Sequence, residues 1–63
     1  MKLDDVKIRS LIYTKHTTQT ALSDRAGVTR MTLNSICNGK SCNEATARKI
    51  ADALDVQIDD IKK

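Results

Sequence analysis

Residues 18–40 read TQTALSDRAGVTRMTLNSICNGK, a stretch that predicts two short helices joined by a tight turn. Thr18 and Thr29 are each placed to cap a helix, because a threonine oxygen accepts hydrogen bonds from the free N–H groups of a first turn. Gln19 would then be the first residue of the earlier helix. Gly27 lies between the two segments, where the chain has to reverse its path.

The second helix, expected over about residues 30–37, has two chemically different faces. Its apolar residues follow the i, i+3, i+4 spacing of a buried stripe and are Leu33, Ile36 and Cys37. The opposite face carries Met31, Asn34, Ser35 and Asn38, with Arg30 reaching out from the first turn. A helix of this kind can enter a DNA major groove and contact base edges. An ordinary solvated face is the simpler alternative at this stage.

Composition limits the fold to one domain, residues 1–63, built from helices. The chain has no Phe, Trp or Pro, and Tyr13 is its only aromatic residue, so aliphatic side chains must form the core. No apolar run approaches the roughly 20 residues of a membrane span. Asp4 and Asp5 follow the first three residues directly, which argues against a signal peptide. We therefore expect a cytoplasmic protein without membrane contact.

The cysteines leave two interpretations open. Cys37 and Cys42 are too far apart for a usual metal motif, although together with His16 they could supply three zinc ligands. The preferred interpretation is that Cys37 fills a core position, that Cys42 is a reduced thiol in a loop, and that neither binds a metal ion. The chain also lacks a glycine-rich phosphate loop and an evident catalytic pair. We expect no enzyme activity, no cofactor and no small-molecule ligand.

The charge distribution favours an anionic partner for the middle of the chain. The net charge is +3 overall, but residues 7–43 carry six cationic side chains and one acidic one, a net charge of +5. Residues 44–63 have a net charge of −1. No acidic residue lies between Arg25 and Asn43, so phosphates would meet little repulsion there. A solvated surface with a chance imbalance of charge is the open alternative.

Three further helices are expected outside this middle stretch. Asp4 is a candidate cap for the first helix, which would end near His16 and bury Ile8, Leu11 and Ile12. Asn43 is a candidate cap for the fourth helix, whose buried stripe would be Ala47, Ile50, Ala51 and Leu54. The last helix would be short, and would either close the core or meet a second subunit through Val56, Ile58 and Ile61.

The ordered set of residues resembles the Cro/Xre-type family of phage-repressor helix-turn-helix domains over nearly the whole chain. The residues that carry the resemblance are Gln19, Leu22, Ala26, Gly27, Val28, Thr29, Leu33, Ile36, Asn38, Gly39, Lys40, Thr46, Lys49, Ile50, Ala51, Ala53 and Leu54. The resemblance implies an all-α, compact five-helix DNA-binding domain, with the helix-turn-helix at helices 2 and 3. It further implies a small transcriptional regulator, such as a repressor, that binds double-stranded DNA.

The same resemblance assigns site residues. The positions that read bases in the family correspond to Arg30, Met31 and Ser35, with Thr29, Thr32 and Asn34 close by. The positions that grip phosphates correspond to Thr18, Gln19, Asn38, Lys40 and Ser41. Many members bind palindromic operators as dimers, which implies a homodimer, expected here through the C-terminal helix.

Five positions depart from the family pattern, and the simplest departure is Ser23, which replaces a common alanine of the second helix. The family often pairs an arginine of its first helix with a glutamate near the end of its third, where this chain has Ile12 and Cys37. Removal of one partner of this ion pair would leave a buried charge unpaired, which destabilises a fold by roughly 3 to 5 kcal/mol. Replacement of both partners by apolar residues can leave the stability unchanged. We therefore expect Ile12 to contact Cys37 or to lie next to it. His16 and Asp55 replace glycines, and each would need a left-handed backbone.

Residue chemistry gives each expected base contact a role. Arg30 can donate two hydrogen bonds to guanine, worth about 1–3 kcal/mol of discrimination. Met31 cannot form useful hydrogen bonds and would pack on a thymine methyl group. An alternative function remains, a protein-interaction module of the same fold in an antirepressor or antitoxin assembly, with the face around Met31 meeting protein.

Overall fold

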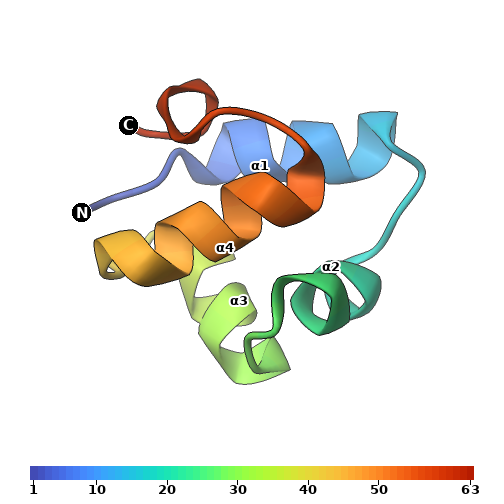
Figure 1. Cartoon of the computed structure of the whole chain (residues 1–63), viewed down its shortest axis with the longest axis horizontal. Helices are drawn as coiled ribbons and strands as arrows, with labels where there is room; N and C mark the ends of the chain where they lie inside the picture. Colours follow the sequence, from blue (N-terminus) through green and yellow to red (C-terminus); the bar gives the residue numbers. More distant parts are fainter.

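The computed structural model describes all 63 residues and is built from helices alone (Figure 1). Four α-helices are followed by one 3₁₀ turn, and the elements are α1 (Asp5–Thr14), α2 (Gln19–Ala26), α3 (Arg30–Cys37), α4 (Glu44–Leu54) and η1 (Ile58–Asp60). The all-helical class is therefore confirmed. None of the helices has the length and apolar character needed to cross a lipid bilayer.

The expected fifth helix is corrected to a single 3₁₀ turn of three residues. The carbonyl of Ile58 accepts hydrogen bonds from the N–H groups of Ile61 and Lys62, at 3.1 and 2.9 Å. The carbonyl of Ile61 is instead taken by the N–H of Asp4, at 2.7 Å. The chain leaves the helical path at this point because its backbone pairs with the N-terminal segment.

Each α-helix begins at the predicted cap. A side-chain oxygen of the cap residue accepts one or two N–H groups of the first turn at 2.8 to 3.2 Å, and the four cap residues are Asp4, Thr18, Thr29 and Asn43. These bonds satisfy donors that have no partner inside the helix. The starts of the four helices were therefore predictable from single residues.

Two of the helix ends use a left-handed residue that is not glycine. Asp55 at the end of α4 has a φ of 60°, and His16 after α1 has a φ of 54°. Both were expected to replace a glycine in this backbone conformation, and the expectation is confirmed. Gly27 has a φ of 74° at the end of α2, which suits glycine because it has no Cβ to clash.

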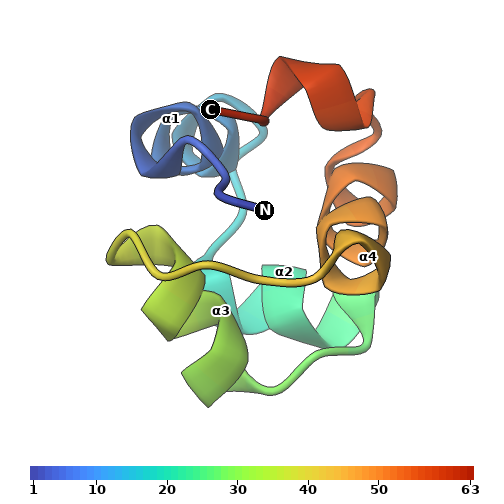
Figure 2. The same cartoon turned by 90° about the vertical axis from the view of Figure 1, so that its left-hand side faces the viewer.

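The core consists of twelve buried aliphatic or cysteine side chains that come from every α-helix and from both terminal segments. α2 packs mainly against α4, while α3 contacts α2 and α1, an arrangement that Figure 2 shows from a second side. One buried polar residue is present, Ser23, and its hydroxyl donates to the carbonyl of Thr20 at 2.8 Å. No buried side-chain polar atom lacks a partner.

The two ends of the chain lie side by side and complete the core (Figure 1). Leu3 and Lys62 form an isolated antiparallel bridge, and the Lys63 N–H donates to the carbonyl of Lys2 at 3.2 Å. Leu3, which belongs to the bridge, and Ile61, which precedes Lys62, are both buried. The last apolar residues were expected either to close the core or to meet a second subunit. Ile61 closes the core.

Candidate nucleic-acid interface

α2 and α3 are joined by a three-residue turn that fixes their relative orientation. The N–H groups of Gly27 and Val28 both bond to the carbonyl of Ser23, at 3.0 and 3.1 Å. The side chain of Val28 packs against the core and holds the turn down. In both views of the ribbon, α3 lies at the edge of the molecule opposite the C-terminal segment (Figures 1 and 2).

α3 has the division of faces that the sequence predicts. Leu33 and Cys37 are completely buried, and Ile36 is almost so. The opposite face is open to solvent, and Met31 is 80% exposed there. Among the other expected base-contacting residues, Arg30, Asn34 and Thr29 are exposed, whereas Thr32 and Ser35 are half-buried at the border of the face.

Two of these residues are linked to each other. The hydroxyl of Thr29 donates to the hydroxyl oxygen of Thr32 at 2.8 Å and accepts the Thr32 N–H at 3.1 Å. Thr29 therefore already uses its hydrogen within the first turn of α3. Thr32 still has its own hydroxyl hydrogen to donate, because a hydroxyl carries one donor and two acceptor sites.

Two shallow hollows flank the outer face of α3 and bring most of the predicted site residues together. The first has a volume of about 520 Å³, and its lining comes from the start of α2 and from α3: Gln19, Thr20, Arg30, Met31 and Asn34. The second has a volume of about 350 Å³, and its lining comes from α3, the following loop and α4: Met31, Thr32, Ser35, Ile36, Ser41, Cys42, Asn43 and Thr46. Met31 lines both hollows.

The remaining predicted phosphate-contacting residues lie just outside these hollows. Thr18 caps α2 next to Gln19, and its oxygen accepts the N–H of Ala21, which leaves its hydroxyl hydrogen free to donate. Asn38 and Lys40 are exposed in the turn that ends α3. The predicted set therefore occupies three neighbouring segments: the start of α2, the whole of α3 and the turn that follows it.

Sequence reasoning missed a contact made by Arg9 of α1. Its Nη2 atom donates to the carbonyl of Cys37 at 2.7 Å and to Oδ1 of Asn38 at 3.4 Å. Arg9 follows the buried Ile8, so it lies at the border of the packed face of α1 and can reach the end of α3. That position was the only signal in the sequence, and it became informative only with the packing of α1 on α3 known.

The environment of Cys37 agrees with a repacked core. Burial raises the pKa of the Cys37 thiol, while the positive charge of Arg9 acts in the opposite direction. Ile12 is half-buried and packs against the core, and its direct contact with Cys37 stays a prediction. Cys42 is half-buried, and burial likewise raises its pKa. Cys37, Cys42 and His16 form no cluster that could hold a metal ion, so the zinc interpretation gains no support.

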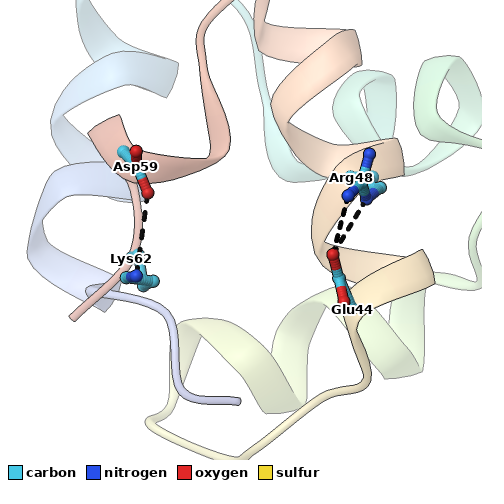
Figure 3. A network of polar contacts seen from close by, with 4 residues as sticks. All are labelled: Glu44, Arg48, Asp59 and Lys62. Atoms are coloured by element: carbon cyan, nitrogen blue, oxygen red, sulfur yellow. Dashed lines mark hydrogen bonds and ion pairs between the residues drawn. The ribbon is translucent and has the colours of Figure 1, made fainter.

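The first acidic residue that follows α3 in the sequence, Glu44, is already paired with a cation. Glu44 and Arg48, one turn apart on α4, form an exposed ion pair at 2.7 Å (Figure 3), and the hydrogen bond from Arg48 lowers the pKa of Glu44. A second exposed pair joins Lys62 to Asp59 at 3.7 Å, in the C-terminal segment (Figure 3). Arg30 takes part in neither pair and keeps its charge available.

Comparison with known proteins gives one fold and one family. The whole chain matches two solved structures with a TM-score of 0.85 and 22% sequence identity, described as native PhpD with cadmium atoms and as PhpD with cadmium complexed with hydroethylphosphonate. It spans only 14% of each of those chains, and the likeness establishes the fold alone. No curated protein matches the sequence. The sequence pattern of the helix-turn-helix family, a family of DNA-binding domains, matches residues 11–61, and the chain therefore belongs to the Cro/C1-type helix-turn-helix family.

Proposed function

We propose that this domain binds double-stranded DNA in a sequence-specific manner, as a small transcriptional regulator, with α3 in the major groove. The observation that carries the proposal is the outward position of Arg30, Met31 and Asn34 on a helix whose other face is buried. An α-helix with its side chains is about 10–12 Å across, and a B-DNA major groove is about 12 Å wide. The exposed face of α3 can therefore enter the groove.

The proposed base contacts differ in strength. Arg30 donates two hydrogen bonds to the O6 and N7 edge of a guanine, and Met31 packs on a thymine methyl group. Asn34 and Ser35 give weaker preferences, because their short side chains can donate or accept. Thr29 contributes least, since its hydroxyl hydrogen is already donated to Thr32, whereas Thr32 is half-buried and keeps one hydroxyl hydrogen to donate.

The proposed phosphate contacts set affinity and register on the duplex rather than base choice. At one end of α3, Thr18 and Gln19 of the α2 start donate to one strand. At the other end, Asn38, Lys40 and Ser41 donate to the opposite strand. The positive charge of residues 7–43 supports these contacts, because each neutralised phosphate releases condensed counterions and strengthens binding.

Selection of bound duplexes from a random-sequence pool tests the proposal. The wild-type domain should bind the selected duplex, with an affinity that falls steeply between about 50 and 200 mM salt. Arg30→Ala should lower the affinity for the selected duplex about 5- to 150-fold and the affinity for a random duplex much less. Lys49→Ala is the matched control, because it removes one exposed and unpaired charge of α4, outside the proposed DNA contacts and outside the C-terminal segment, and should reduce both affinities slightly and equally.

Equal losses of Arg30→Ala on both duplexes would make Arg30 a phosphate contact and contradict its base-reading role. The alternative function, a protein-interaction module, is favoured by the exposure of the apolar Met31 on the same face. Salt separates the two functions, because an apolar protein interface would barely respond to the same change in ionic strength.

We further propose that two copies bind a palindromic site. The longest dimension of the domain is 26 Å, whereas successive major grooves on one side of the duplex are about 34 Å apart. One copy of the domain therefore covers one half-site. A palindromic site with two half-sites needs a two-fold pair of copies, which contact each other through the outer side of the C-terminal segment. Palindromic selected sites with that spacing are the expected outcome. Isolated half-sites would contradict the dimer.

A further inference from the structure

We propose that Arg9 is a positioning residue, which holds the end of α3 and presents the amide hydrogens of Asn38 to a DNA phosphate. The inference rests on the proposed DNA-binding function and adds to it a residue from α1, an element with no expected DNA contact. The observation behind it is the pair of contacts from one guanidinium nitrogen to Cys37 and Asn38.

The orientation of the Asn38 amide follows from the chemistry of Arg9. A guanidinium has five N–H donors and no acceptor, so only the amide oxygen of Asn38 can face it. The NH₂ group of Asn38 must then point away from Arg9. No acceptor within the chain takes its hydrogens, and Asn38 is exposed. Without Arg9 the amide could rotate and present either its oxygen or its nitrogen to solvent.

The stronger of the two contacts secures the end of α3 itself. The carbonyl of Cys37 lies in the last turn of the helix and carries part of its negative dipole, which a cation stabilises. The next three N–H groups, from Asn38, Gly39 and Lys40, bond back to carbonyls of α3 at 3.0 to 3.1 Å. Arg9 thus supplies, from another helix, the hydrogen bond to the carbonyl of Cys37 at the end of α3.

A phosphate is the partner that fits the donors gathered in this turn. The neutral NH₂ of Asn38 and the ammonium group of Lys40 both come from the same short turn after α3. Phosphate oxygens accept hydrogen bonds from both kinds of donor. No acidic residue occurs in the sequence between Arg25 and Asn43. Asp5 of α1 is the nearby carboxylate, since its charge raises the pKa of the Cys37 thiol, but it forms no ion pair with Lys40 or Arg9.

A double-mutant cycle tests the role of Arg9. Arg9→Met, Asn38→Ala and the double variant are compared with the wild type for binding to a random-sequence duplex. Thermal melting establishes a temperature at which all four proteins are folded. We expect each single variant to lose about tenfold in affinity and the double variant to lose no more than Asn38→Ala. This non-additivity is the signature of a residue that acts through another.

The salt dependence separates positioning from direct contact. Because Arg9 is expected to neutralise no phosphate itself, Arg9→Met should leave the slope of log affinity against log salt unchanged. Removal of a direct phosphate contact would reduce that slope by about 0.9. Arg9→Lys is the companion variant if Arg9→Met proves unstable. It keeps the charge but not the planar fork, and it should bind between wild type and Asn38→Ala.

The outcomes distinguish this inference from the proposed function. Additive losses, or a reduced salt slope, with intact wild-type binding would overturn the positioning role of Arg9 alone. Absence of duplex binding by the wild type would overturn the proposed function, and this role of Arg9 with it.

Discussion

Met31 stands out at the scale of the single residue because it is a large apolar side chain that the fold leaves outside. It is 80% exposed, although the other apolar residues of α3 are buried. Its exposure followed directly from helical spacing, since it falls opposite Leu33 and Ile36. Arg9 could not be assigned in the same way, because its contacts join residues 28 and 29 positions apart. Local pattern predicts which way a side chain faces but not which distant backbone it meets.

The proposed contact of Met31 with a thymine methyl group makes a quantitative prediction. Replacement of the contacted thymine by deoxyuridine removes one methyl group, whose burial is worth about 0.8 kcal/mol, or about fourfold in affinity. The wild-type domain should therefore bind the selected duplex with about fourfold lower affinity when that thymine is replaced.

Met31→Ala is the control for this measurement, because it removes the partner of the methyl group. With Met31→Ala the deoxyuridine replacement should have almost no effect. A methyl effect that persists in Met31→Ala, or that is absent at every thymine of the site in the wild type, would contradict the contact.

At the scale of the secondary-structure element, the ends of helices explain which parts of the fold could be predicted. The four cap residues are local signals, and all four α-helices begin where those residues stand. The last element was misjudged because its end depends on a pairing with the N-terminal segment. The spacing of Val56, Ile58 and Ile61 fits one helical turn as well as a longer helix, so the sequence pattern could not tell them apart.

The end of α4 supplies a stability prediction. Asp55 has a left-handed backbone at the C-terminus of the helix, and it places a negative charge where the helix dipole is also negative. Asp55→Gly relieves both costs, although glycine also gains freedom in the unfolded chain. We expect a net stabilisation of about 0.5–1 kcal/mol, or a rise in Tm of about 2–8 °C, measured by thermal melting.

Asp55→Ala is the matched control, since it removes the same charge but keeps a Cβ at positive φ. Its melting temperature should stay below that of Asp55→Gly. Equal melting temperatures for the two variants would attribute the whole effect to charge and none to the backbone.

At the scale of the whole molecule, stability depends on closure of the core by the two chain ends. A domain of 63 residues has a free energy of unfolding of about 3–9 kcal/mol, so one large core side chain is a substantial part of the total. Leu3 and Ile61 come from opposite ends of the sequence, and both are buried where the antiparallel bridge joins these ends. The same closure supports the DNA-binding face, because Arg9 projects from α1, which begins directly after this bridge.

Ile61→Ala tests that dependence on the C-terminal segment. Ile61 is completely buried, and truncation of such a side chain to alanine costs about 2–5 kcal/mol in transfer energy and residual cavity. Urea unfolding should therefore show a large fall in the denaturation midpoint, with part of the population unfolded even without urea. Ile58→Ala is the control, because Ile58 is only half-buried in the same turn and loses less contact. If Ile61→Ala were as stable as Ile58→Ala, the bridge would be a surface attachment, and residues 1–60 would hold the core by themselves.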